Sequence, residues 1–177
     1  MKSSCNIFLV GMMGAGKTTV GRLLARHLGK LFYDCDHEIE ARTGVRVSVI
    51  FEIEGEQGFR KREAEELRRL AALDQVVLAT GGGAVLDSLN RTLLTERGFV
   101  IYLHALPKDL WHRTRHDNSR PLLDTPDPRT RVEELYRIRD SLYREVADLV
   151  VDTGRQSVNV LVKKLLTKLG AQCKLSA

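Results

Sequence analysis

Cysteine is scarce in this chain, and its few cysteines are scattered. The 177 residues contain three, with no Cys-x-x-Cys pair, so the sequence predicts neither a disulfide framework nor a structural zinc site. Long apolar runs are also missing, because no stretch approaches the ~20 residues of a membrane-spanning helix. No signal-peptide pattern precedes the first apolar segment. We therefore expect a cytoplasmic protein. We expect the thiols Cys5, Cys35 and Cys173 to be packing residues or incidental.

Repeats, low-complexity tracts and clusters of basic residues are absent as well. The net charge is +5, but Lys and Arg are spread along the chain, and the aromatic residues that stack on bases make up only 6% of it. We therefore expect no nucleic-acid and no membrane partner, and we attribute the positive charge to a site for small anions. The length fits one domain, so we expect residues 1–177 to fold as a single unit and to act as a monomer.

The most informative pattern is Gly-Met-Met-Gly-Ala-Gly-Lys-Thr at residues 11–18, which matches the phosphate-binding motif G-x-x-x-x-G-K-[ST]. A short apolar run precedes it and a segment with helical spacing of apolar residues follows. In such a loop the backbone N–H groups and the helix N-terminus face the phosphates, Lys17 reaches the terminal phosphates, and the Thr18 hydroxyl can ligate Mg²⁺. The pattern predicts a nucleotide-binding protein. The alternative is a chance glycine-rich turn.

Strand-like and helical segments alternate along the chain. This alternation predicts an α/β fold, a parallel sheet covered by helices on both faces. The expected strands are Ile7–Val10, Leu31–Asp34, Val76–Thr80, Val100–Leu103 and Leu149–Asp152. The expected helices are Lys17–Leu28, Asp36–Thr43, Phe59–Leu73, Leu86–Arg97, Leu106–Arg113, Arg129–Val146 and Ser157–Leu169.

Two carboxylates, Asp34 and Asp36, follow the second expected strand. The carboxyl ends of parallel strands face the ligand crevice, so both side chains are expected there. Asp34 is placed to hold Mg²⁺ directly or through water, and Asp36 could accept a proton or a hydrogen bond from a substrate hydroxyl. Alternatively, Asp36 only caps the following helix, and both roles can coexist.

The third expected strand ends in Thr80-Gly81-Gly82-Gly83, where many phosphate-loop proteins have an aspartate that holds the metal. The missing aspartate leaves the metal to Asp34. Three glycines have no side chain to obstruct a ligand and suit close backbone approach, although a plain flexible turn would look the same.

Arg139 interrupts an apolar stripe on the helix expected at Arg129–Val146. Turning a guanidinium inward is costly unless an anion meets it, so we expect Arg139 to face a carboxylate or phosphate of the ligand, or an internal acid. The helix at Phe59–Leu73 carries many more charges, and spacing alone does not single out Arg60 among them. We assign most of them to a solvated face with pairs such as Arg62/Glu66 and Glu65/Arg69.

The segment Arg115–Pro128 breaks the alternation of strands and helices. Its Asp, Asn, Ser and Pro residues favour turns over a continuous helix. In a phosphate-handling fold, an exposed loop that carries Arg115 and Arg120 is a candidate lid. The alternative is an ordinary surface connection.

Taken in order, these motifs resemble those of the shikimate kinase family. The resemblance runs from about residue 5 to residue 169. It rests on the phosphate loop at residues 11–19, the Asp-Cys-Asp string at 34–36, the Gly-Glu-x-x-Phe-Arg-x-x-Glu segment at 55–63, the three glycines at 81–83, Arg-Pro-Leu-Leu at 120–123 and Arg139 before Tyr143.

The resemblance implies a three-layer α-β-α P-loop kinase fold with a five-stranded parallel sheet in the order 2-3-1-4-5, substrate-binding helices at about 36–63 and a mobile lid at about 114–128. It implies transfer of the γ-phosphoryl of ATP to the 3-hydroxyl of shikimate, with Mg²⁺, in aromatic amino-acid biosynthesis. By this likeness Lys17, Asp36 and Arg120 are catalytic, and Thr18 and Asp34 hold the metal. Shikimate would be bound by Asp36, Arg60, Gly81, Gly82, Gly83 and Arg139. ATP would be bound by Gly14, Ala15, Gly16, Lys17, Thr18, Thr19, Arg113, Arg120 and Arg155. Of these residues, Arg113 and Arg155 would lie beside the adenine.

Three other classes of protein were weighed. A regulatory GTPase should carry Asn-Lys-x-Asp and Asp-x-x-Gly, and neither string occurs in the chain. A gluconate or nucleotide kinase of the same fold remains an alternative that substrate comparison would separate. A non-enzymatic protein built on an inactive kinase is disfavoured, because Lys17, Asp36 and Arg120 are all present.

Overall fold

The structure, a computed structural model, describes residues 6–154 and 156–173. Its centre is a five-stranded sheet in the order β2-β3-β1-β4-β5, and every neighbouring pair of strands is parallel. This confirms the predicted sheet and its strand order. The strands are β1 (Ile7–Val10), β2 (Leu31–Asp34), β3 (Val76–Ala79), β4 (Phe99–His104) and β5 (Leu149–Asp152).

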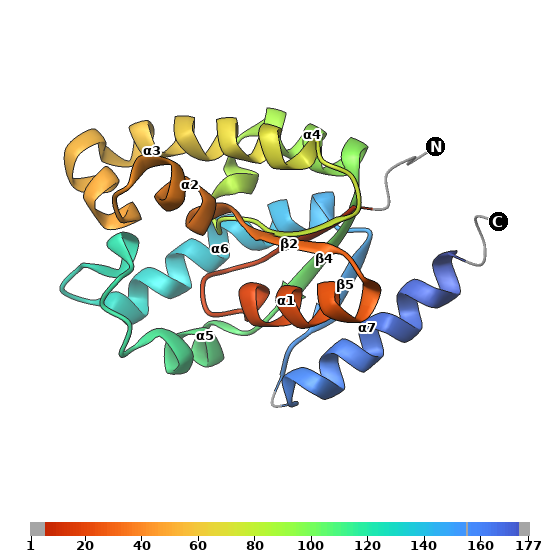
Figure 1. The fold of residues 1–177 in the computed structure, drawn as a ribbon. Helices are drawn as coiled ribbons and strands as arrows, with labels where there is room; N and C mark the ends of the chain where they lie inside the picture. Colours follow the sequence, from red (N-terminus) through yellow and green to blue (C-terminus); the bar gives the residue numbers. More distant parts are fainter. Residues whose placement is uncertain (1–5, 155, 174–177) are drawn as a thin grey trace.

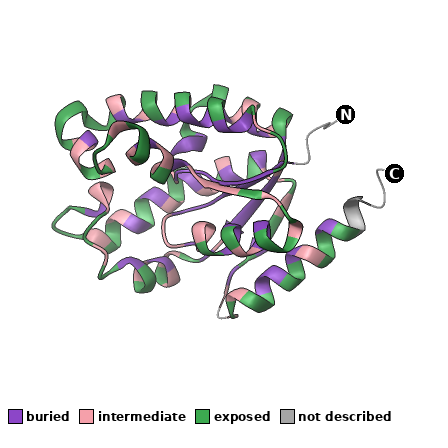
Figure 2. Ribbon diagram, in the orientation of Figure 1, coloured by how far each residue is buried: buried purple, intermediate pink, exposed green. Residues whose placement is uncertain are grey.

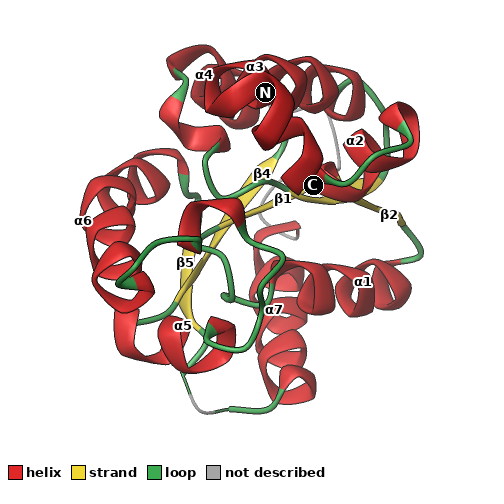
Figure 3. Ribbon diagram, turned by 90° about the vertical axis from the view of Figure 1, so that its left-hand side faces the viewer, coloured by secondary structure: helices red, strands yellow, loops and turns green. Residues whose placement is uncertain are grey.

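Helices cover both faces of the sheet (Figure 1). The helices α1 and α7 pack against each other on one face, and contacts join α3 to α4 and α4 to α6 on the other (Figure 3). In the described part of the chain no helix is long and apolar enough to cross a membrane. The helices are α1 (Lys17–Leu28), α2 (Cys35–Thr43), α3 (Val47–Ala71), α4 (Ser88–Arg97), α5 (Pro107–Thr114), α6 (Pro128–Val146) and α7 (Val158–Cys173), with short 3₁₀ turns η1 (Ala84–Leu86) and η2 (Pro121–Leu123).

The core lies between the sheet and its two layers of helices. Every residue of β1 and β3 is buried, as expected for inner strands of a parallel sheet whose two faces are both covered (Figure 2). Cys35 packs in this core as a free thiol, while Cys5 and the side chain of Cys173 lie outside the described residues. The core therefore fixes the carboxyl ends of the strands, from which the site is built.

The helix α3 starts earlier than the sequence pattern predicts. The helix begins at Val47 and not at Phe59, and it bends at Gly55, whose φ of 69° and ψ of −179° are not helical. The two glycines in this stretch weaken the helical pattern in the sequence, and the bend changes the direction of the apolar face. The contact that starts the helix is tertiary, because the Val47 N–H donates to Glu40 of α2 at 2.8 Å.

The charge pairs expected on α3 were wrong. Glu66 is buried and accepts from Arg42 and Arg69, while Arg62 donates to Glu54 across the bend. The i,i+4 rule describes an isolated helix surface, but this face of α3 packs against α2. The second half of α3 thus buries two acids, Glu63 and Glu66, along with its apolar residues.

Candidate active site

The phosphate loop connects β1 to α1. Gly14 and Gly16 have φ angles of 80° and 94°, a region that residues with a side chain rarely adopt. Gly16 caps α1 without a side chain, so no side chain satisfies the first N–H groups of the helix. Uncapped N–H groups and the helix dipole at this point favour an anion.

Lys17 lies at the start of α1 and turns back over the loop. Its Nζ donates to the carbonyl oxygen of Gly11 at 2.7 Å and to that of Met12 at 3.0 Å. Burial lowers the pKa of Lys17 to about 8, while the nearby carboxylates of Asp34 and Asp36 oppose this shift. A phosphate would supply the negative charge that the buried ammonium lacks.

Asp34 ties the end of β2 to two other elements. Its Oδ2 accepts from the Thr18 hydroxyl at 2.5 Å, and its Oδ1 accepts from the backbone N–H groups of Asp36 and His37 at 3.1 and 3.2 Å. Asp34, not Asp36, is therefore the cap of α2, so the alternative role considered for Asp36 is wrong. The capping frees the Asp36 carboxylate to face the cavity.

Asp36 has a buried carboxylate oxygen, Oδ1, with no hydrogen-bond partner. Burial, together with the negative charges of Glu63 and Asp34, raises the pKa of Asp36 to about 7, although the cations Lys17 and Arg60 oppose this shift. A carboxylate with a pKa near neutrality is half protonated at pH 7. It is therefore suited to accept a proton and to release it again.

Arg60 reaches from the second half of α3 to the glycine loop after β3. Its Nη1 donates to Glu63 at 2.7 Å and its Nη2 to Glu56 at 3.0 Å, while its Nε has no partner. Burial alone would lower the pKa of Arg60, but Glu63 and Glu56 raise it. The guanidinium occupies the space that a Cβ at Gly83 would need, and the Glu63 carboxylate does the same at Gly81. These two glycines allow charged groups to lie against the backbone.

Arg139 is the largest fully buried side chain, and its Nε and Nη1 have no hydrogen-bond partner. Burial lowers its pKa. Within the described residues no carboxylate forms an ion pair with it, so the structure does not contain the ion pair that we considered. On the same helix, the Tyr143 hydroxyl donates to the carbonyl oxygen of Gly82 at 2.5 Å and thereby joins α6 to the glycine loop.

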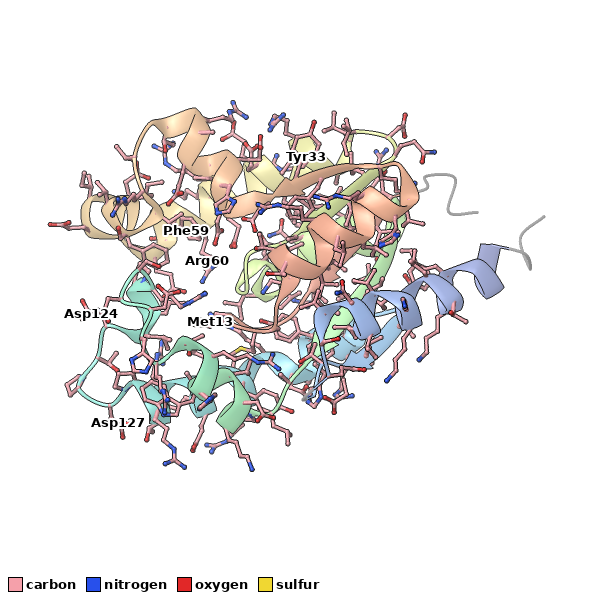
Figure 4. The ribbon with its side chains drawn as sticks, turned by 60° about the horizontal axis from the view of Figure 1, so that its bottom comes forward. Met13, Tyr33, Phe59, Arg60, Asp124 and Asp127 are labelled. Atoms are coloured by element: carbon pink, nitrogen blue, oxygen red, sulfur yellow. The ribbon has the colours of Figure 1, made fainter. Side chains whose placement is uncertain are left out.

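One cavity of about 740 Å³ brings most of the predicted site residues together. Phe59 and Arg60 of α3 lie across from Met13 of the phosphate loop (Figure 4). The bend at Gly55 folds Phe51 against Phe59, with ring centroids 4.7 Å apart, and both rings line the cavity. The predicted residues that line it are Gly14, Gly16, Lys17, Thr18, Thr19, Asp34, Asp36, Arg60, Gly81, Gly82, Gly83, Arg120 and Arg139. Ala15 is buried beneath the loop.

Arg113 lies apart from this cavity, beside a second one of about 470 Å³. Its Nη1 donates to the carbonyl oxygen of Gly14 and to the Thr153 hydroxyl, both at 3.2 Å, and its Nη2 donates to the carbonyl oxygen of Gly154 at 2.9 Å. Arg113 thus joins the phosphate loop to the segment after β5. Arg155, expected in the same segment, lies outside the described residues.

The segment expected to be a lid, residues 114–128, runs between α5 and α6 and includes η2. Arg120 enters the cavity from it, with its Nε donating to Asp117 at 2.8 Å, whereas Leu123 packs in the core. Asp124 and Asp127 are exposed on the outer side of the lid (Figure 4). The lid is therefore anchored at Leu123 and presents its arginine inward.

Several residues of the cavity wall have no role predicted from the sequence, among them Glu63, Phe51 and Arg46. Glu63 stood among many charges on one helix, and only its packing against the glycine loop distinguishes it. Arg46 and Phe51 precede the bend, in a stretch that we did not expect to be helical. One feature of the sequence could have pointed to Phe51, namely that it and Phe59 lie four residues before and after Gly55.

Comparisons with known proteins agree with this geometry. The family model of shikimate kinase matches residues 13–170. The shikimate kinase of Burkholderia thailandensis is 60% identical over 164 residues, which are 93% of this chain and 89% of that protein. That of Ralstonia nicotianae is 61% identical over 167 residues, 94% of this chain and 88% of that protein.

Among solved structures, a shikimate kinase is much more similar to this chain than a gluconokinase of related fold. A shikimate kinase from Acinetobacter baumannii in complex with shikimate is 46% identical, with a TM-score of 0.93 over 97% of this chain and 96% of that one. A gluconokinase from Sinorhizobium meliloti is 17% identical with a TM-score of 0.59, a likeness of fold alone. The chain therefore belongs to the shikimate kinase family.

Proposed function

We propose that the chain transfers the γ-phosphoryl of ATP to the 3-hydroxyl of shikimate, giving shikimate 3-phosphate and ADP. One observation supports this most strongly. Within the described residues, the buried side-chain atoms without a hydrogen-bond partner belong to Asp36, Arg60, Glu63 and Arg139. All four side chains line the cavity that the phosphate loop closes on its other side. Unpaired buried groups are costly, so a ligand is expected to pair them.

We propose that Arg60 and Arg139 bind the carboxylate of shikimate. Both guanidiniums have buried N–H groups without a protein acceptor, and a carboxylate accepts such donors in short, charge-assisted bonds. Hydrogen bonds to Glu63 and Glu56 hold the guanidinium of Arg60 in position before the ligand binds. The Glu63 carboxylate and the Arg60 guanidinium take the space that side chains at Gly81 and Gly83 would need, and we propose that the backbone of Gly81, Gly82 and Gly83 contacts shikimate beside them.

We propose that Asp36 orders the ring hydroxyls of shikimate and accepts the proton of the 3-hydroxyl. The oxygen of that hydroxyl bonds to the γ-phosphorus of ATP while the bond from the γ-phosphorus to the ADP oxygen breaks. Phosphoryl transfer needs alignment and neutralisation of charge more than covalent help from the protein. Lys17 on the loop and Arg120 on the lid supply cations at the phosphates, and N–H groups at residues 14–19 hold them. Arg113, beside the second cavity, is proposed to contact the adenine.

We propose that Thr18 and Asp34 hold Mg²⁺ when the nucleotide is bound. No cluster of three or more His, Cys, Asp or Glu able to hold a metal occurs among the described residues, so phosphate oxygens and water must complete the set. The Thr18 hydroxyl and Asp34 Oδ2 are hard oxygen donors of the kind this cation prefers, and because Thr18 donates its proton to Asp34, the hydroxyl oxygen keeps its lone pairs free for the cation. Bound there, Mg²⁺ would neutralise charge on the phosphates.

The proposed activity is tested by ADP release coupled to NADH oxidation, with ATP and Mg²⁺ and with shikimate, gluconate or nucleoside monophosphates as acceptors. We expect turnover with shikimate and none with the other two classes of acceptor. ³¹P NMR of the product should show a phosphate coupled to the proton on carbon 3. Asp36→Asn serves as the matched control that keeps the size of the side chain. Turnover with gluconate or a nucleotide and none with shikimate would reject the proposal.

We further propose that the enzyme acts as a cytoplasmic monomer without nucleic-acid or membrane partners. The scattered distribution of its basic residues and the need for cations in an anion-binding cavity support this. Size-exclusion chromatography with light scattering should give a mass near 19.9 kDa. A stable dimer at micromolar concentration would contradict it.

A further inference from the structure

A second group of charged side chains joins α2 to α3 outside the cavity, and Glu66 lies at its centre. Glu66 has a side chain that is only 4% exposed. Its Oε2 accepts from Arg42 Nη1 at 3.0 Å, and its Oε1 accepts from Arg69 Nε at 2.9 Å. Arg69 also donates from Nη2 to Glu38 at 3.0 Å. One buried carboxylate of α3 is thereby linked to two residues of α2, Arg42 directly and Glu38 through Arg69.

Apart from this group of charges, few side chains of α2 are buried. Of its nine residues, Cys35 and Ile39 are the buried ones. Its start is tied to β2 by the Asp34 cap, and Glu40 accepts from the first N–H of α3. The remaining links are polar, and exposed ion pairs contribute little to holding a helix. Among the acids that fasten α2 to α3, Glu66 is the buried one, so its two bonds are the least weakened by water.

The same helix carries Asp36 in its first turn. From this geometry we propose that Glu66 is a positioning residue, which acts through Arg42 and Arg69 to hold α2 so that Asp36 faces the acceptor hydroxyl. The inference rests on the proposed role of Asp36. A displacement of about 1 Å in a reacting group can cost about 100-fold in rate, so a small tilt of α2 would be felt.

Stability alone does not explain a buried carboxylate at this position. Glu66 does not line the cavity, so no ligand needs its charge. Arg42 and Arg69 are 51% and 40% exposed and would be solvated without it. Replacing a buried ion pair by an apolar side chain of similar volume is often neutral or stabilising. Position and stability can therefore be measured separately.

The test compares Glu66→Leu with Glu65→Leu, a matched change at the exposed neighbouring position. For Glu66→Leu we expect a fall of about 10- to 100-fold in kcat with shikimate, a KM for ATP within about twofold of the parent, and a melting temperature that is unchanged or higher. Glu65→Leu should leave all three quantities unchanged. A kcat for Glu66→Leu within twofold of the parent would overturn the inference.

A second variant covers the case in which Glu66→Leu fails to fold. The double change Glu38→Ala with Arg42→Ala removes both links on the α2 side and leaves Glu66 paired with Arg69. We expect the same fall in kcat and a melting temperature close to that of the parent. A parental kcat in this variant would also overturn the inference.

Asp36→Asn, measured alongside, separates failure of this inference from failure of the proposed function. If Asp36→Asn retains parental turnover, the proposed role of Asp36 is wrong. If Asp36→Asn is inactive while the Glu66 and Glu38/Arg42 variants turn over at the parental rate, the role of Asp36 stands and the positioning role of Glu66 does not.

Discussion

The two sides of the cavity differ in how their polar groups are satisfied. On the phosphate side, the functional groups of Lys17, Thr18 and Asp34 all have hydrogen-bond partners within the protein. On the acid-binding side, five buried atoms of Asp36, Arg60, Glu63 and Arg139 have none. The phosphate side is built from one loop and the strand end beside it. The acid-binding side is assembled from α2, α3, α6 and the glycine loop.

This difference shows where each side obtains its stability. On the phosphate side the functional side chains already have partners in the folded chain, and the groups left open for an anion are the uncapped N–H groups at the start of α1. The acid-binding side carries unpaired charges whose cost the remainder of the fold must offset until an anion arrives. Removing a charged group should therefore lower activity on both sides, and on the acid-binding side it should also stabilise the unliganded protein.

The largest effect is expected for Arg120→Ala, which removes the lid cation between the two sides. If Arg120 neutralises charge on the transferring phosphoryl, kcat should fall by about 10³- to 10⁵-fold, or roughly 4–7 kcal/mol of barrier. The dissociation constant for shikimate, measured by calorimetry, should change little, because Arg120 is not expected to bind the carboxylate. Arg115→Ala on the same lid is the control. Turnover near the parental value would remove Arg120 from the mechanism.

Arg139→Met should move binding and stability in opposite directions. Loss of the buried guanidinium should weaken shikimate binding by about 2–5 kcal/mol. The free energy of unfolding without ligand should rise by about 1–4 kcal/mol, because an unpaired buried charge is replaced by an apolar side chain.

Urea titration and calorimetry on the same preparation measure both quantities for Arg139→Met. Arg137→Met, at an exposed position on the same helix, should leave both unchanged. A variant at Arg139 that is less stable yet binds shikimate normally would show that this guanidinium serves the fold and not the ligand.

The pH dependence of stability should also separate the two sides. The pKa of Asp36 is about 7 in the folded chain against 3.8 in the unfolded chain. Between these pH values the folded state holds a proton that the unfolded state releases, so stability falls as pH rises, by at most about 1.4 kcal/mol per pH unit. Lys17 has the opposite sign. With a pKa of about 8 against 10.5, it makes stability rise between pH 8 and 10.5.

Urea unfolding of the ligand-free protein from pH 4 to pH 10 measures both slopes. Asp36→Asn should make the decline between pH 4 and 7 shallower and leave the rise above pH 8. Lys17→Met should do the reverse. Glu63, whose pKa burial also raises, accounts for the rest of the decline in Asp36→Asn. If the decline between pH 4 and 7 is the same in Asp36→Asn as in the parent, another group is responsible for it.

The smallest effect is expected for Gly83→Ala. The added Cβ overlaps the guanidinium of Arg60, which must shift. We expect the KM for shikimate to rise by roughly tenfold, about 1.4 kcal/mol, with the KM for ATP unchanged. Gly170→Ala is the control, because a Cβ there meets no atom within 4 Å. An unchanged KM for shikimate would mean that the contact between Arg60 and the loop is not needed for binding.

The sequence alone predicts the phosphate side well because its determinants are local. One motif specifies the loop, Lys17 and Thr18, and the alternation of segments predicts the sheet. Arg139 is also predictable, because a charge within an apolar stripe is visible at helical spacing. The strand order and the role of Arg60 came from the family resemblance and not from periodicity.

The remaining details depend on tertiary packing. Glu63 and Glu66 look like solvated residues of a charged helix, and only the approach of the glycine loop and of α2 buries them. The start of α3 at Val47 depends on an acceptor from α2, which no pattern within residues 47–58 contains. The assigned roles of the site residues stay predictions until the variants are measured.

The bend in α3 limits how the acceptor pocket can be redesigned, because it restricts which residue can stand at position 55. A Cβ at Gly55 would meet nothing within 4 Å, so the restriction there is one of backbone conformation and not of space. Its combination of φ and ψ is open to glycine alone. A mutant library aimed at new acceptors should therefore vary Phe51 and Phe59 freely and leave the joint between them untouched.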